Sequence, residues 1–192
     1  MNYETKELRT DRLIIKRGQE EDYLKVYEYD FSKLKDIDGV FKLEKQDLSK
    51  IKSWFKGGVK RYYNKLKKAH MFDWIIYVGN VPVGNILTTE ENIDKKEIEI
   101  SYNLHPSFWG NGYIREAITS VMEYLFSIGY DNIVCAFLDG DLKAKKTLNM
   151  LGFRPYEIIE DDYKSESGNL IDKYKTIMTK DDWFARTGRI KL

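Results

Sequence analysis

The sequence is poor in cysteine, in proline and in long hydrophobic runs. Its 192 residues include one cysteine, three prolines and two histidines. A lone cysteine cannot form an internal disulfide, which indicates a reducing compartment. Residues 1–10 are too polar for a signal peptide, and no apolar stretch is long enough to span a bilayer. We therefore expect a cytoplasmic protein that needs neither a membrane nor a metal.

An excess of one charge is also lacking, because 32 Lys and Arg face 31 Asp and Glu. This balance excludes the global field of a nucleic-acid-binding protein. Residues 54–68 interleave basic and aromatic side chains, which we interpret as an amphipathic helix rather than a nucleic-acid surface. Hydrophobic residues reach 42% and aromatic residues 14%, enough for a substantial core. Without a linker or repeat, residues 1–192 are predicted to form a single domain.

Hydrophobic periodicity predicts a mixed α/β chain. Strands are expected at 11–18, 71–78, 81–90, 95–104, 132–139, 153–162 and 170–179, and helices at 19–34, 47–70, 112–128 and 141–152. Gly79-Asn80 between two strands is typical of a β-hairpin, and Gly152 is expected to be the C-cap of the helix at 141–152. The strand, helix and strand within 95–139 indicate a parallel crossover inside a mostly antiparallel sheet.

The segment 105–126, HPSFWGNGYIREAITSVMEYLF, combines a two-glycine loop with the start of an amphipathic helix. Amides at a helix N-terminus attract phosphate, and Gly110 and Gly112 leave the loop backbone free of Cβ atoms. A P-loop is excluded because no Lys-Ser/Thr follows. A dinucleotide fingerprint is excluded because Arg115 stands where its third glycine belongs. A pyrophosphate cradle and a plain turn remain the alternatives.

The motifs EISYNLHPSFWGNGYIREA and AKKTLNMLGF resemble the GNAT superfamily of acetyl-CoA-dependent N-acetyltransferases. TDRLIIKR, QEEDYLKVYEY and WIIYVGNVPVGNI, with the late Trp183, are similar to the branch of the ribosomal-protein N-terminal alanine acetyltransferases. The resemblance covers about residues 9–184. It implies a seven-stranded, mostly antiparallel sheet flanked by about four helices, with a V-shaped splay between the strands near 97–104 and 132–139.

The resemblance also implies acetyl-CoA as cosubstrate, with its pyrophosphate on the glycine loop. The cofactor-binding residues it implies are Asn103, Leu104, Trp109, Gly110, Asn111, Gly112, Tyr113, Ile114, Arg115, Asp141 and Ala144. The chain departs from the family pattern at Ile114, where a small residue is usual. Asp141 and Ala144 stand where many members have Asn and Ser, and Leu148 replaces a frequent catalytic Tyr.

Acetyl transfer needs a neutral amine and therefore a base. Glu99 matches the family's strand glutamate and is the expected base, with Glu97 in reserve. Tyr156 or Tyr102 could replace the missing acid, and a thiolate can also leave unaided. Cys135 lies in an apolar strand and is not expected to be a nucleophile.

These residues predict an N-acetyltransferase that acts on a primary amine, either a protein N-terminus or a small molecule. Ala144, Leu148 and Ile114 favour the alternative, a non-catalytic CoA-binding or ribosome-associated module. We expect no nucleic-acid partner, and a homodimer is an open alternative for the assembly.

Overall fold

The computed structural model describes residues 5–27, 72–164 and 168–188. These residues fall into two compact units. The first unit contains residues 5–27, 72–88 and 102–121, and the second contains 89–101, 122–164 and 168–188. The helix expected at 47–70, with its basic and aromatic stretch, lies outside the described residues.

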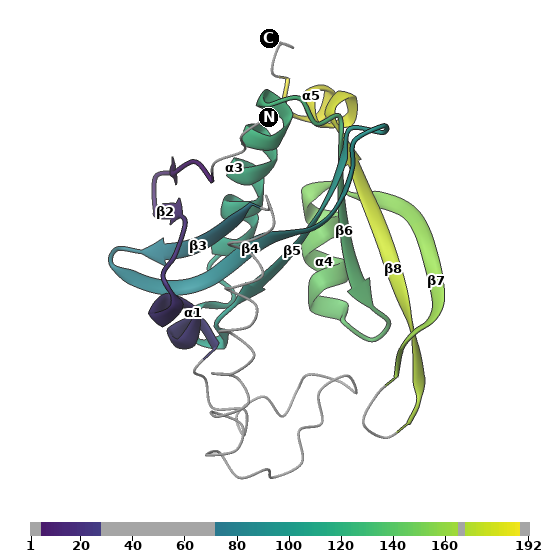
Figure 1. The fold of residues 1–192 in the computed structure, drawn as a ribbon, viewed down its shortest axis with the longest axis horizontal. Coiled ribbons are helices and arrows are strands. Elements are labelled where there is room, and N and C mark those ends of the chain that lie inside the picture. Colours follow the sequence, from purple (N-terminus) through teal and green to yellow (C-terminus); the bar gives the residue numbers. More distant parts are fainter. Residues whose placement is uncertain (1–4, 28–71, 165–167, 189–192) are drawn as a thin grey trace. The chain divides into compact units, whose positions relative to one another are not determined.

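The strands form one eight-stranded sheet in the order β1-β2-β3-β4-β5-β6-β8-β7 (Figure 1). Their bounds are β1 Leu8–Arg9, β2 Leu13–Lys16, β3 Asp73–Val78, β4 Val81–Asn92, β5 Glu97–Leu104, β6 Asn132–Leu138, β7 Arg154–Lys164 and β8 Leu170–Thr179. Pairing is parallel between β5 and β6 and antiparallel for β1–β2, β2–β3, β3–β4, β6–β8 and β7–β8. The predicted fold class is confirmed. The predicted count of seven strands is wrong, because the two-residue β1 is too short for a periodic signal.

Four α-helices and one 3₁₀ helix occur in the described ranges. They are α1 Glu20–Tyr27, the 3₁₀ helix η2 Pro106–Phe108, α3 Tyr113–Ser127, α4 Leu142–Leu151 and α5 Lys180–Thr187. Gly152 ends α4 in the left-handed conformation, with φ 91°, as its C-cap position predicts. Helix α5 was missed, although Thr179 accepts a hydrogen bond from the Asp182 amide in the manner of an N-cap. None of these helices is long and apolar enough to cross a membrane.

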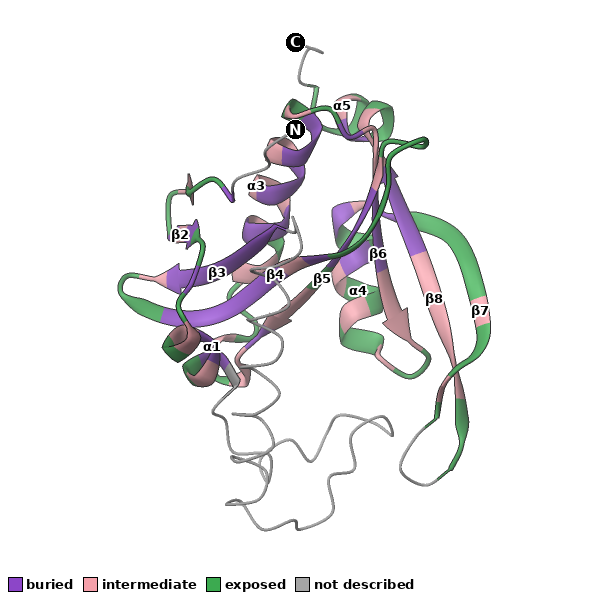
Figure 2. Cartoon of the chain, in the orientation of Figure 1, coloured by how far each residue is buried: buried purple, intermediate pink, exposed green. Residues whose placement is uncertain are grey.

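In the first unit, β3 and β4 supply the buried centre. They meet in the predicted hairpin, where Gly79 has a left-handed φ of 59°. Strand β3 is buried on both faces (Figure 2), which explains the apolar run that follows its first residue, Asp73. On one of these faces, Ile75 and Tyr77 pack with Tyr23 and Val26 of α1.

In the second unit, β6 is paired on both sides over part of its length. Its parallel register with β5 runs from Glu97 opposite Asn132 to Ile100 opposite Cys135, which confirms the predicted crossover. Strand β6 then continues to Leu138, and its antiparallel register with β8 extends over that whole length. The parallel pairing between β5 and β6 thus covers only the first four residues of each strand.

Candidate active site

The glycine loop of the first unit begins with a capped 3₁₀ turn. His105 caps η2, where its Nδ1 accepts a hydrogen bond from the Ser107 amide at 3.2 Å. Gly110 and Gly112 have φ values of 81° and 77°. Both are left-handed conformations that residues with a Cβ adopt at a cost. The loop therefore needs two glycines for its geometry, directly before α3.

Two side chains of the loop are used to hold the loop itself. The indole Nε1 of Trp109 donates a hydrogen bond of 2.7 Å to the carbonyl of Leu104. The Asn111 amide donates to the carbonyls of Phe108 at 3.1 Å and Trp109 at 3.2 Å. These bonds fix the loop, so any contact of Trp109 or Asn111 with a ligand would be expected mainly through the backbone.

Strand β4 lies very close to the end of β5 at Gly84. A Cβ at this position would lie 2.5 Å from the carbonyl oxygen of Asn103 and 3.0 Å from Leu104 Cδ1. Within the described chain, the buried Nδ2 of Asn103 has no hydrogen-bond partner. A buried amide donor without a partner is costly and fits a polar ligand group. The geometry is therefore suited to a polar group of the cosubstrate, for which Asn103 and Leu104 were expected binding residues.

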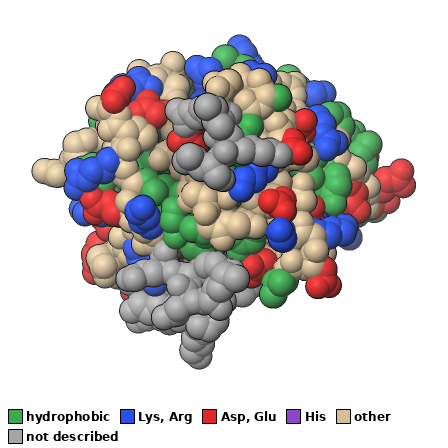
Figure 3. Space-filling model, turned by 90° about the horizontal axis from the view of Figure 1, so that it is seen from above, with side chains coloured by type: hydrophobic (Ala, Val, Ile, Leu, Met, Phe, Trp, Pro, Cys, Tyr) green, Lys and Arg blue, Asp and Glu red, His purple; other side chains and the backbone are tan. Residues whose placement is uncertain are grey.

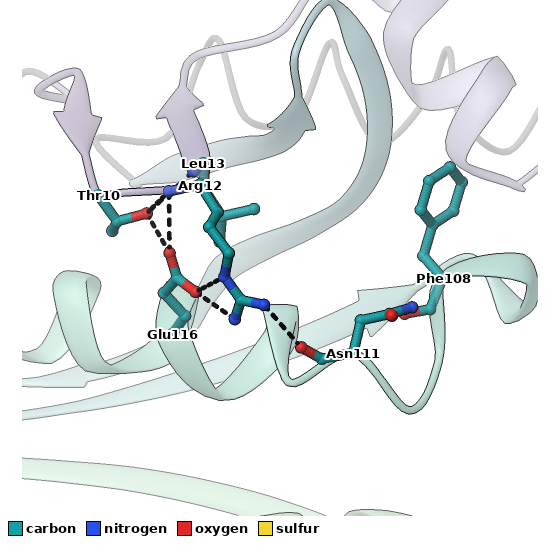
Figure 4. A network of polar contacts seen from close by, with 6 residues as sticks. All are labelled: Thr10, Arg12, Leu13, Phe108, Asn111 and Glu116. Carbon is teal, nitrogen blue, oxygen red and sulfur yellow. Dashed lines mark hydrogen bonds and ion pairs between the residues drawn. The ribbon is translucent and has the colours of Figure 1, made fainter.

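Arg12 reaches the glycine loop from the turn before β2, a contact that the sequence did not reveal (Figure 4). Its Nη1 donates to the carbonyl of Asn111 at 3.0 Å, and its Nε donates to Glu116 Oε2 at 2.7 Å. The guanidinium also lies 4.8 Å from the ring centre of Tyr113. The stretch TDRLIIKR contributed to the family resemblance, but no local pattern in it predicted a contact of Arg12 with the glycine loop.

Glu99, the expected base, lies in the second unit and is only 8% exposed. Its Oε1 accepts a hydrogen bond from Thr89 Oγ1 at 3.1 Å, and its Oε2 is 3.0 Å from Lys175 Nζ. Lys175 also reaches Glu90 at 3.3 Å. Burial opposes the charge of Lys175, but both carboxylates outweigh that effect and raise its pKa. Glu99 is therefore a buried carboxylate held by a cation, not a solvated strand residue.

The other candidate groups of the second unit differ in environment. Tyr156 is 39% exposed and donates to Glu97 Oε2 at 3.1 Å, so the expected acid and the reserve base contact each other. Cys135 is fully buried, and burial together with the charge of Glu99 raises its pKa well above the ordinary value. A protonated, buried thiol supports the view that it is not a nucleophile.

The start of α4 is closed by its own cap. Asp141 accepts a hydrogen bond from the Ala144 amide at 2.9 Å, so these two predicted cofactor residues bind each other. Leu148 lies in the core, which makes it a packing residue at the place of the frequent tyrosine. Within the described ranges, no group of three His, Cys, Asp or Glu is placed to hold a metal ion.

Basic and acidic side chains alternate on the face shown in Figure 3.

Comparison with known proteins assigns the family. Residues 12–154 match the Acetyltransferase (GNAT) domain, so the chain belongs to the GNAT acetyltransferase family. It is 30% identical over 117 residues to the uncharacterized N-acetyltransferase p20 of Bacillus licheniformis. That match covers 60% of this chain and 65% of the p20 sequence, slightly less than two thirds of it.

Two solved structures show the same fold at low identity. The ribosomal-protein-S5-alanine acetyltransferase from Vibrio fischeri has a TM-score of 0.68 and 16% identity, over 92% of this chain and 98% of that one. The microcin C7 self-immunity acetyltransferase MccE, solved with acetyl-CoA and AMP, has a TM-score of 0.65 and 15% identity, over 88% and 93%. The family and the fold class that the sequence motifs implied are thereby confirmed.

Proposed function

We propose that the chain is an N-acetyltransferase that transfers the acetyl group of acetyl-CoA to a primary amine. The observation that carries this proposal is the loop of two left-handed glycines directly before α3, in a chain of the GNAT family. Such a loop turns backbone amides and the positive end of a helix toward an anion. We infer that the pyrophosphate of acetyl-CoA binds there, on the loop and helix start formed by residues 109–114.

Acetyl-CoA supplies the activated thioester, and the protein supplies orientation and proton transfer. Glu99 takes up a proton from the incoming amine, directly or through a water, so that the nitrogen has a free lone pair. Its contacts with Thr89 and Lys175 hold the carboxylate in a fixed place. Tyr156 is the proposed donor to the leaving thiolate, and its contact with Glu97 orients the hydroxyl.

The acceptor is proposed as a protein N-terminus or a small-molecule amine. The branch motifs and the fold shared with the Vibrio fischeri enzyme support the first class. The fold shared with the microcin C7 self-immunity acetyltransferase MccE supports the second. We propose that the protein works in the cytoplasm as a single domain.

A panel of amines incubated with acetyl-CoA tests the activity, with free CoA measured through a thiol reagent and the product by mass spectrometry. Glu99→Gln should lower turnover by about 10²–10⁴-fold while CoA affinity persists, and higher pH should partly rescue it. Glu97→Gln, on the same strand face, tests the reserve base in the same assay. A loss confined to the Michaelis constant for the amine would make Glu99 an anchor and move the base role to Glu97 or solvent.

The rival proposal is a non-catalytic CoA-binding or ribosome-associated module. Leu148 in the core and the closed Asp141–Ala144 cap are the observations that favour it. The rival predicts CoA binding without CoA release from acetyl-CoA for any amine. Acetylation of one amine by the wild type, lost in Glu99→Gln, would exclude it.

A further inference from the structure

The N-terminal turn and the start of α3 are joined by one dense polar network (Figure 4). Glu116 lies in the first turn of α3, and its Oε1 accepts a hydrogen bond of 2.5 Å from the Thr10 hydroxyl. Its Oε2 accepts a hydrogen bond of 2.7 Å from Arg12 Nε and forms an ion pair of 2.5 Å with Arg12 Nη2. Arg12 Nη1 remains for the carbonyl of Asn111 at 3.0 Å. One guanidinium thus connects the carboxylate of the helix to the backbone of the glycine loop.

Glu116 poses an electrostatic problem for a loop that binds an anion. A carboxylate in the first turn stabilises an isolated helix, because it attracts the partial positive charge of the helix N-terminus. The same charge repels a phosphate that approaches the same amides. Burial raises the pKa of Glu116, but the hydrogen bonds from Thr10 and Arg12 outweigh it and keep this pKa below the ordinary value. The repelling charge is therefore present at neutral pH.

Arg12 provides the compensation through its shape as well as its charge. Its planar fork can hold a carboxylate and a carbonyl at once, which a lysine ammonium cannot do with the same geometry. The Cβ direction of Gly112 points toward Arg12 Nη2 at 3.7 Å and Arg115 Nη2 at 3.4 Å. A side chain at Gly112 would therefore face the guanidinium groups of Arg12 and Arg115. The Glu116 carboxylate points toward Thr10 and Arg12 in the N-terminal turn.

We propose that Arg12 is a positioning residue for the pyrophosphate of CoA: it fixes the carbonyl of Asn111 and neutralises Glu116, so that the loop amides are available to a phosphate. This inference rests on the proposed function of the loop. It adds a residue almost one hundred positions away from the loop in sequence. Arg12 acts through Asn111 and Glu116 and needs no contact with the ligand.

Calorimetric titration of the full chain with CoA and with 3′-dephospho-CoA tests the proposal without any acceptor amine. Arg12→Met should weaken both ligands equally, by about 10–100-fold, the range of a lost charge-assisted contact. Arg12→Lys should give a smaller loss, of about 3–10-fold, because it keeps a charge but not the fork. Arg9→Met is the matched control and should bind as the wild type does, since the exposed Arg9 of β1 pairs with Glu7, the residue before that strand.

The double variant Arg12→Met/Glu116→Gln separates this role from a merely structural one. Removing the carboxylate should restore most of the CoA affinity that Arg12→Met loses, whereas a structural defect would persist. Equal CoA affinity of Arg12→Lys and the wild type would overturn the inference. So would a double variant whose CoA affinity does not recover. Both tests remain available even if Arg12→Met does not fold. Loss of CoA binding with retained binding of 3′-dephospho-CoA would also overturn it. A wild type that binds neither ligand would refute the proposed function itself.

Discussion

Replacing Lys175 with methionine leaves the Glu99 carboxylate buried without its cation. The side chains of Lys175 and Glu99 are only 13% and 10% exposed, and their charged atoms are 3.0 Å apart. Breaking a buried pair by removing one partner costs about 3–5 kcal/mol, whereas an exposed pair contributes about 0–1 kcal/mol. Glu99 keeps the hydrogen bond from Thr89, and Glu90 is exposed enough to turn to water. We therefore expect a loss of about 2–4 kcal/mol in the free energy of unfolding at pH 7.

Urea unfolding followed by tryptophan fluorescence and by circular dichroism measures this loss. We expect the midpoint to move to lower urea concentration while the slope of the unfolding free energy against urea stays the same. The double variant Lys175→Met/Glu99→Gln should be less destabilised than the single one, with a coupling of about 1–3 kcal/mol, because no unpaired charge remains. Lys173→Met is the matched control on the same strand. Lys173 reaches Asp162 only at 4.0 Å with more exposed side chains, so we expect less than about 1 kcal/mol.

The pH dependence has a definite sign. The folded-state pKa of Lys175 is raised, so its contribution is fully present at neutral pH and is lost as pH rises above the ordinary value of 10.5. Additive single variants, or equal losses in Lys175→Met and Lys173→Met, would refute the reasoning that Glu99 depends on this cation.

Substitutions at three further positions test the first unit. Burial raises the pKa of Asp73 to about 6, against the opposing effects of Tyr23 and Arg17, so wild-type stability should fall as pH rises from about 4 to 6. Asp73→Asn should remove this fall and gain about 1–3 kcal/mol at pH 7 in urea titrations, and an unchanged pH slope would contradict it. Gly84→Ala should displace the Asn103 carbonyl, cost about 1–3 kcal/mol and raise the Michaelis constant for acetyl-CoA; unchanged values would show that the strands can separate freely. Gly112→Asp should abolish CoA binding in titrations, because a carboxylate in the phosphate-binding loop would repel the phosphates of the ligand. Gly112→Ala carries the same left-handed strain without the charge and should lose less, so equal affinities of the two variants would sink the charge argument.

Local signals carried most of the fold that could be predicted. Alternating apolar residues predicted the strands, Gly79-Asn80 predicted the hairpin, and Gly152 predicted the end of α4. These features depend on neighbours a few positions apart, which the sequence presents directly. The two glycines before α3 were recognisable for the same reason, since their left-handed backbone is a local requirement.

Some capping signals in the sequence were not recognised. Asp141 and Ala144 were predicted to contact the cofactor, and the structure shows in addition that Asp141 is the N-cap of α4 and accepts a hydrogen bond from the Ala144 amide. Thr179 and Asp182 have the same spacing, and α5 was still missed. In both cases a stronger expectation, from the family pattern or from the preceding strand, concealed a capping signal.

The surroundings of the candidate catalytic groups were decided only by the tertiary structure. Lys175 reaches Glu99 because β8 lies beside β6 in a register that places Lys175 opposite Ala136. Shifting that register by one residue would turn Lys175 to the other face of the sheet, and no local pattern specifies it. Arg12 meets Glu116 across 104 positions for a similar reason, through a turn that ends beside the first turn of α3. The sequence by itself determined which residues could bind an anion or accept a proton, whereas long-range packing determined which charges surround them, because electrostatic energy depends on distance and burial rather than on order along the chain.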